Sequence, residues 1–209
     1  YSVADEPIIL CLPGSRKSEI DRLMPVFGET LKKFSNVLPT ARFVLPSTPD
    51  VYKYSKKYLG CMPKDLIFLT PEKIGLDKYF KFKKASFKIS SLALAASGTV
   101  SLELAANNTP MVIGYDMNFL SRQIIGLMLK TETVNLVNLI TGNRSVPECL
   151  GTNFNSENLF LDMVRVYSNN QNQIKDFKTT MELLGRNHET PNIRAANSLL
   201  RFCRNFKMV

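Results

Sequence analysis

The sequence predicts an α/β protein: a Rossmann-like parallel sheet with helices on both faces, followed by a helical C-terminal tail. Short apolar strands alternate with segments of helical periodicity through the first two thirds of the chain, which is typical of βαβ units. The strands are apolar along their whole length, as in Ile8-Ile9-Leu10-Cys11-Leu12. Strands of this kind are expected where helices cover both faces of a parallel sheet.

The first strand leads into a segment with apolar residues at helical spacing, namely Ile20, Leu23, Met24, Phe27, Leu31 and Phe34. Strands are expected at residues 7–12, 42–46, 65–69, 91–96, 110–115 and 133–137. Helices are expected at 17–36, 49–59, 75–84, 99–108 and 118–130.

From Ser156 onward the pattern is helical, because apolar residues recur at spacings of three and four. Two more helices are expected near 172–185 and 192–205, with Pro191 at the start of the last one. There is no internal repeat, low-complexity tract or clear linker. Residues 1–209 are therefore expected to form a single domain.

A glycine turn with two cations follows the first strand. It reads Pro13-Gly14-Ser15-Arg16-Lys17-Ser18-Glu19 and opens the first helix. Arg16 can hold a phosphate or carboxylate group through two parallel hydrogen bonds, whereas Lys17 acts as a point charge. The turn has neither the P-loop spacing nor the glycine fingerprint of a dinucleotide site.

A second turn of this kind, Ser97-Gly98-Thr99, follows the apolar run Leu92–Ala96 and opens another helix. Free backbone N–H groups and two hydroxyls at a helix N-terminus can bind phosphate, and Gly98 lets a ligand approach the backbone. The alternative is an ordinary capped turn, with Thr99 as N-cap and Glu103 favouring the helix dipole. Two such turns together indicate one diphosphate ligand at the carboxyl edge of the sheet.

Composition limits the function classes. The chain has 209 residues, of which 44% are apolar, and no uncharged apolar stretch approaches eighteen residues, so no transmembrane helix is expected. Its four cysteines are far apart and it has one histidine, His188, which is expected at the surface. These counts favour reduced thiols and argue against a zinc ribbon, a disulfide scaffold or a histidine-based metal site or triad.

The net charge of +9 leaves open a protein that binds an anionic surface. Lysines are dense in the first half, and most of them are expected to form an ordinary solvated face. They also alternate with Phe80, Phe82 and other aromatic residues, which suits an anionic membrane surface. Phe80, Phe82 and Phe87 are expected either in the core or against lipid. No common RNA- or DNA-binding motif is present, so nucleic acid is not expected as a partner.

Five blocks between Pro7 and Leu150 occur in a characteristic order and spacing: LPGSRKSEI at 12–20, AASGTVSLE at 95–103, TPMVIGY at 109–115, VNLVNLI at 134–140 and VPE at 146–148. Together they resemble the C-terminal half of the lipid-A-disaccharide synthase family. The resemblance implies one half of a two-Rossmann-domain (GT-B) glycosyltransferase. It also implies that the N-terminal acceptor domain, with the catalytic base, is absent from this chain.

The resemblance implies transfer of a sugar from UDP-2,3-diacylglucosamine to 2,3-diacylglucosamine 1-phosphate, in lipid A biosynthesis and by an inverting mechanism. It implies no cofactor and no metal, and there is no Asp-x-Asp pair. The expected location is the bacterial cytoplasm, peripheral to the inner face of the cytoplasmic membrane. Two alternatives stay open: another UDP-sugar enzyme of this architecture, such as an epimerase, and a non-catalytic basic module that binds membrane or RNA.

By resemblance, the donor or UDP-binding residues are Gly14, Ser15, Arg16, Ser97, Gly98, Thr99, Glu103, Asn138 and Tyr115. The first six are assigned to the diphosphate and Glu103 to the ribose hydroxyls. Asn138 would position donor or acceptor, or else form an Asx turn after a strand. Tyr115 would line the cleft or simply pack, and Glu148 would either belong to the family motif or start a helix.

The chain departs from the family pattern on the acceptor side. Asp116 stands where the family commonly has a cation, and Gly126-Leu127 replaces an expected basic pair. The resemblance leaves Arg122 or Arg144 as substitutes for those cations.

Overall fold

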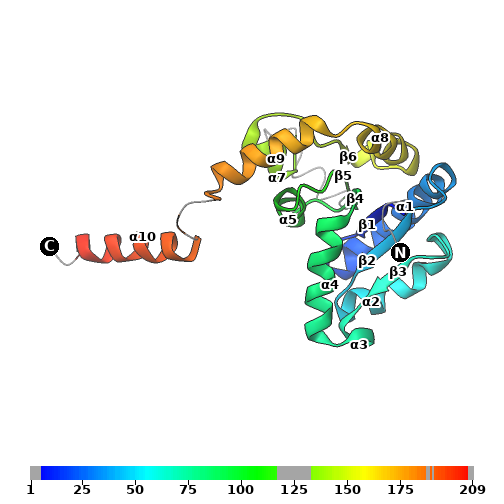
Figure 1. The fold of residues 1–209 in the computed structure, drawn as a ribbon, viewed down its shortest axis with the longest axis horizontal. Helices are drawn as coiled ribbons and strands as arrows, with labels where there is room; N and C mark the ends of the chain where they lie inside the picture. The colour runs from blue at the N-terminus through cyan, green and yellow to red at the C-terminus, as the bar shows by residue number, and fades with distance from the viewer. Residues whose placement is uncertain (1–5, 117–132, 187–188, 190, 207–209) are drawn as a thin grey trace.

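The computed structural model describes residues 6–116, 133–186, 189 and 191–206 (Figure 1). Its centre is a six-stranded parallel sheet of order β3-β2-β1-β4-β5-β6. The strands are β1 (Ile8–Leu12), β2 (Arg42–Pro46), β3 (Ile67–Leu69), β4 (Leu92–Ala95), β5 (Met111–Tyr115) and β6 (Glu148–Leu150). The sheet confirms the predicted class.

Helices follow nearly every strand in the described part of the chain. They are α1 (Lys17–Val37), α2 (Pro49–Ser55), α3 (Pro71–Ile74), α4 (Leu76–Ile89), α5 (Val100–Ala106), α7 (Leu136–Thr141), α8 (Ser156–Ser168), α9 (Gln171–Leu183) and α10 (Pro191–Phe206). The described residues also form two 3₁₀ turns, η2 (Lys56–Cys61) and η3 (Gly151–Asn153).

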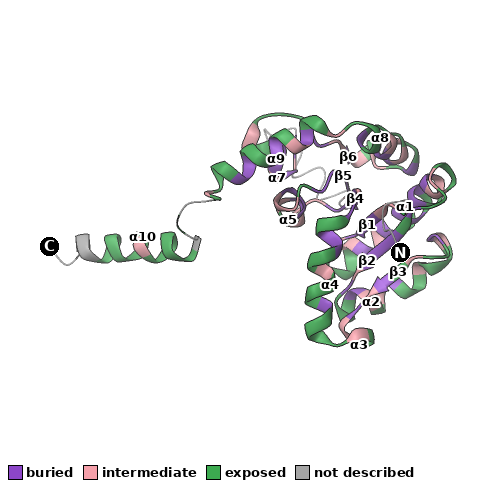
Figure 2. Cartoon of the chain, viewed as in Figure 1, coloured by how far each residue is buried: buried purple, intermediate pink, exposed green. Residues whose placement is uncertain are grey.

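Both faces of the sheet are covered, as the apolar strands predict. Ile9 and Cys11 of β1 pack with α1, α2 and α8, whereas Leu10 and Leu12 pack on the other side with α4, α5, α7 and α9. The buried positions in Figure 2 follow this arrangement: the central strands β1, β4 and β5 are almost wholly buried, whereas the outer strands and the helices are buried only in part. Alternate residues of one strand thus serve two separate cores.

The prediction of a strand at 133–137 is wrong. Asn135 instead caps α7, because its side chain accepts hydrogen bonds from the backbone N–H groups of Val137 and Asn138. The sixth strand is β6, so Glu148 begins a strand and not a helix. The helix expected at 118–130 lies outside the described residues, as does His188.

The helical C-terminal tail is present, and α10 extends away from the rest of the molecule (Figure 1). Several of its large apolar side chains are exposed, namely Ile193, Leu199, Leu200 and Phe202. Within the described residues, every helix is too short or too polar to cross a bilayer.

A close contact between α1 and η2 leads to a stability prediction. A Cβ added at Gly28 would overlap the carbonyl oxygen of Cys61, whereas one added at Gly60 would meet no atom within 4 Å. We expect Gly28→Ala to lower the free energy of unfolding by about 1–3 kcal/mol, because overpacking forces the backbone to shift. Urea denaturation would measure the change. Gly60→Ala is the control, expected within about 0.5 kcal/mol of wild type; equal effects of the two variants would contradict the prediction.

Candidate functional site

The sheet changes winding direction between β1 and β4. The chain passes from β1 outward to β2 and β3, and then returns to place β4 on the other side of β1. Leu12, the last residue of β1, pairs with Ala95, the last residue of β4. The two predicted phosphate turns therefore leave the same sheet edge from adjacent strands, where ligands of open α/β sheets bind.

These turns open into one cleft of about 470 Å³. It brings together seven of the nine predicted donor-binding residues: Gly14, Ser15, Arg16, Ser97, Gly98, Thr99 and Glu103. The remaining walls come from the ends of β1 and β2, from α2 and from α4. The structure thus brings both motifs to a single cleft.

The first turn presents two backbone N–H groups to one point. Gly14 has φ 92°, a conformation that only glycine adopts readily, and it lets the following amides converge. The N–H groups of Ser15 and Arg16 both donate to Oε2 of Glu19, at 3.1 and 3.3 Å. The Arg16 guanidinium donates to Oε1 of the same carboxylate at 3.0 Å. The Glu19 carboxylate therefore occupies the position at which this turn could bind an anionic ligand.

The second turn is built around Gly98, which has φ 147° and has open space where a Cβ would be. Thr99 takes the N-cap position of α5, but its side chain makes no capping hydrogen bond. The hydroxyl of Ser97 donates to the carbonyl oxygen of Val134 at 2.8 Å. This turn differs from the first. The Thr99 hydroxyl is exposed, lines the cleft and does not cap the helix, whereas the amides of the first turn are used by Glu19.

Three cleft residues come from α4 and were not predicted from the sequence. Tyr79, Lys83 and Phe87 are spaced four residues apart, so they share one helix face, and all three line the cleft. Burial, together with the nearby Glu103 carboxylate, raises the pKa of Tyr79 above its ordinary value. Lys83 lies 3.4 Å from Glu103. Their spacing of four residues is visible in the sequence, but the alternation of aromatic residues with lysines there predicts a membrane surface or a core and does not predict a ligand cleft.

The structure does not place Asn138 in this cleft. Its side chain donates to the Val146 carbonyl oxygen at 2.8 Å and to Glu148 Oε2 at 3.0 Å, and it accepts from Val146 N–H at 3.1 Å. The Asx turn considered for it is formed by Asn135 instead. In the described residues its contacts are thus those of a structural side chain, and its predicted donor role stays a prediction.

Glu148 is the centre of that polar network. Its carboxylate, only 7% exposed, accepts hydrogen bonds from Val134 N–H, Asn135 N–H, the Asn138 side chain and the Thr133 hydroxyl. Since Val134 in turn accepts from Ser97, the network joins β6 to the second turn of the cleft.

Tyr115 also lies outside the cleft lining: it is half-buried at the end of β5 and packs against the core beneath α1 and α8. Arg144 is 3.9 Å from Glu148 and lines a separate hollow with Lys175 and Asp176. Arg122 and Gly126-Leu127 are outside the described residues. Among the residues that the structure does describe, none form a cluster of His, Cys, Asp or Glu side chains able to hold a metal ion.

Comparison with solved structures defines the class. A trehalose-6-phosphate synthase aligns with 98% of this chain and 46% of its own, at 11% identity and a TM-score of 0.57. A UDP-GlcNAc 2-epimerase from Neisseria meningitidis, solved with UDP-GlcNAc, aligns with 86% of this chain and 44% of its own, at 14% identity and a TM-score of 0.50. The fold is that of one half of a GT-B enzyme.

Sequence comparison defines the family. The model of the lipid-A-disaccharide synthetase family matches residues 3–201, and the chain belongs to this family. The lipid-A-disaccharide synthase of Ruegeria pomeroyi is 41% identical over 194 residues, which are 93% of this chain and 48% of that protein. The one from Rhodospirillum centenum is 34% identical over 199 residues, which are 94% and 48%. The chain therefore spans about half the length of these relatives.

Proposed function

We propose that this chain is the donor-binding half of a lipid-A-disaccharide synthase. It would hold the UDP group of UDP-2,3-diacylglucosamine while the sugar is transferred to 2,3-diacylglucosamine 1-phosphate. Family membership supports the reaction class. The observation that carries the proposal is the single cleft into which both phosphate-binding turns open.

In this proposal the diphosphate lies between the two turns. Arg16 and the amides of Ser15 and Arg16 bind it from one side. The backbone of Ser97 and Gly98 and the Thr99 hydroxyl bind it from the other side, while the Ser97 hydroxyl keeps its hydrogen bond to the Val134 carbonyl oxygen. Glu103, exposed at the cleft and near Lys83, accepts hydrogen bonds from the ribose hydroxyls. Tyr79 and Lys83 join them as donors to the ligand.

The chemistry follows from a diphosphate leaving group. Negative charge builds on UDP as its bond to the sugar breaks, and cations and amides that are already in place stabilise that charge. In the proposed inverting mechanism a general base deprotonates the acceptor hydroxyl, and this base belongs to the other half of the enzyme. This half of the reaction requires no cofactor.

We further propose that the partner surface is an anionic membrane, at the inner face of the cytoplasmic membrane. On α4, Phe80 and Phe82 are exposed by 59% and 52%. Exposed lysines Lys81, Lys84 and Lys88 lie on the same helix. Exposed rings beside lysines are typical of surfaces that contact anionic lipid headgroups, whereas Phe87 belongs to the core and the cleft.

Thermal unfolding with UDP tests the donor site. UDP at 100 times its dissociation constant should stabilise the folded chain by about 2.7 kcal/mol, which raises the melting temperature by several degrees. Uridine, which lacks phosphate, is the control and should give a much smaller shift. No shift at millimolar UDP would contradict the proposal.

Two further measurements separate the alternatives. A donor panel of acylated and plain UDP-N-acetylglucosamine distinguishes this family's reaction from that of an epimerase-like enzyme. A non-catalytic basic module predicts binding to anionic vesicles or RNA that is unchanged by substitutions at Arg16 and Ser97–Thr99.

A further inference from the structure

The charged side chains of the cleft neutralise one another. The described lining contains two cations, Arg16 and Lys83, and two carboxylates, Glu19 and Glu103. Each cation lies beside one carboxylate: Arg16 is 3.0 Å from Glu19, and Lys83 is 3.4 Å from Glu103. A diphosphate that enters this cleft must therefore compete with groups already present.

The competition is direct at Glu19. Its carboxylate uses both convergent N–H groups of the first turn and the guanidinium of Arg16. A Cβ at residue 14 would overlap Oε2 of Glu19, so glycine at this position leaves the room that the oxygen fills. The side chain of Glu19 is 15% exposed, against 52% for Glu103, so it is the more enclosed of the two. The geometry is that of an anion-binding nest holding an internal anion.

We propose that Glu19 is an exchangeable counter-anion, which occupies the phosphate seat in the free protein and is displaced by the diphosphate of the donor. This inference rests on the proposed function. A backbone N–H has one hydrogen to donate, so the Ser15 and Arg16 amides cannot serve the carboxylate and a phosphate oxygen fully at once. Two anions side by side would also repel each other.

The displacement requires only a side-chain movement. Glu19 lies in the first turn of α1, and rotation about its side-chain torsions moves the carboxylate toward water while the helix stays intact. The two amides thus have an anionic partner both in the free protein, where it is Glu19, and in the donor complex, where it is the diphosphate. The site should therefore prefer diphosphates over ligands with a single negative charge, because such ligands displace Glu19 less readily.

The test compares the wild-type chain with Glu19→Gln, using inorganic pyrophosphate and UDP as probes in isothermal titration calorimetry. Glutamine keeps the size of the side chain but removes the charge that holds it on Arg16. The variant should bind both probes about tenfold more tightly than wild type, which corresponds to one charge-assisted hydrogen bond. Circular dichroism would confirm that the variant is folded.

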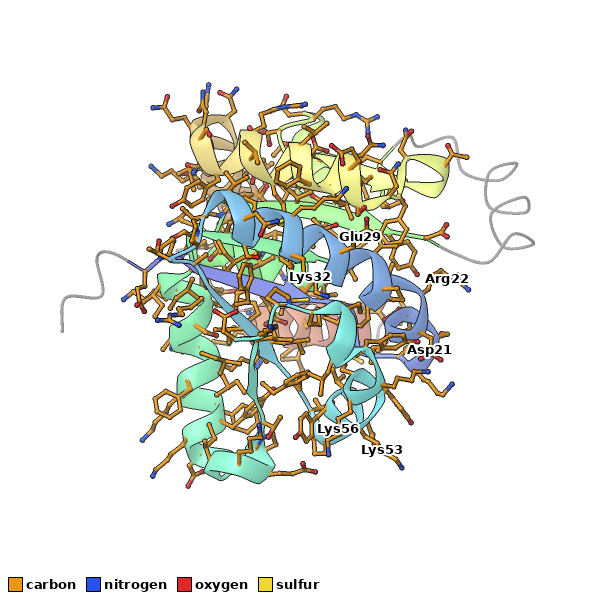
Figure 3. All side chains as sticks on the ribbon, turned by 90° about the vertical axis from the view of Figure 1, so that its right-hand side faces the viewer. Asp21, Arg22, Glu29, Lys32, Lys53 and Lys56 are labelled. Carbon is orange, nitrogen blue, oxygen red and sulfur yellow. The ribbon has the colours of Figure 1, made fainter. Side chains whose placement is uncertain are left out.

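Asp21→Asn is the matched control. Asp21 lies one half-turn further along α1, and Figure 3 shows it beside the 3₁₀ segment η2 among other charged side chains. Its partners are Lys17, Lys57 and Tyr58, and Lys17 and then Lys57 hold the pKa of this carboxyl well below its usual range. The control removes the same charge from the same helix without emptying the seat, so it should change both affinities by less than about twofold.

The outcomes are distinct. Equal or weaker pyrophosphate binding by Glu19→Gln would overturn the inference and assign Glu19 to positioning Arg16. An equal gain in Asp21→Asn would also overturn it, because the effect would then be general electrostatics. If UDP binds no better than pyrophosphate to either form, the proposed function fails, while the pyrophosphate comparison still decides the role of Glu19.

Discussion

Replacing Arg16 with alanine is expected to weaken UDP binding by about 10- to 100-fold. The guanidinium is 79% exposed at the mouth of the cleft and can hold a phosphate through two parallel hydrogen bonds. Losing hydrogen bonds to a charged group costs about 1.5–3 kcal/mol, and each 1.4 kcal/mol is tenfold in affinity. At a UDP concentration 100 times the wild-type dissociation constant, a hundredfold weaker variant keeps only about 0.4 kcal/mol of ligand stabilisation. Thermal shift and calorimetry would both measure this loss.

Arg165→Ala provides the matched control for this variant. Arg165 on α8 is 73% exposed and pairs with Asp162 three residues earlier, so its surroundings resemble those of Arg16 apart from the cleft. Its removal should leave UDP binding unchanged. Arg16→Lys should recover only part of the affinity, because lysine keeps the charge without the forked geometry. Full binding by Arg16→Ala would show that the diphosphate lies elsewhere.

Replacing Glu148 with alanine is expected to lower the free energy of unfolding by at least about 3 kcal/mol. The substitution removes one buried acceptor and leaves four donors without it: the Thr133 hydroxyl, the Val134 and Asn135 N–H groups and the Asn138 amide. Each buried donor without a partner costs about 1–3 kcal/mol, although water entering the site would satisfy some of them. Urea denaturation would measure the loss.

The control for Glu148 is Glu157→Ala. Glu157 also forms an ion pair, with Lys33 at 2.6 Å, but its side chain is 61% exposed against 7% for Glu148. An exposed ion pair contributes at most about 1 kcal/mol, so this variant should stay near wild type. Similar losses in the two variants would show that burial of the Glu148 network contributes nothing extra.

The sequence was sufficient to predict the layers of the fold and the meeting of the two turns. Both predictions rest on local rules: apolar strands between helical segments imply a parallel sheet, and all parallel strands end at the same edge. The two failures have different causes, a local helix cap in the first case and contacts with distant residues in the second. Residues 133–137 have the composition of a strand, but the Asn135 side chain caps a helix there. The three-residue strand β6 was missed because it begins with a charged residue that distant donors satisfy.

The site was predicted less completely than the fold, because some of its side chains come from elements that are distant in the sequence. Motifs identify the residues that follow a strand, and these seven residues do line the cleft. They do not identify a side chain that arrives from another helix, such as Lys83 or Tyr79 on α4. Nor does a motif show that Glu19 already uses the amides of its own turn, because that depends on the conformation of one side chain.

The reversal of winding direction between β1 and β4 affects how the cleft responds to amino-acid substitutions in its walls. The cleft exists because the chain connections diverge to opposite sides of the sheet at this point. It does not depend on the size of the side chains that line it. Substitutions along its walls should therefore alter which molecule it prefers while leaving a recess in the same place. Such a scaffold lets ligand preference drift through evolution without rebuilding the domain beneath it.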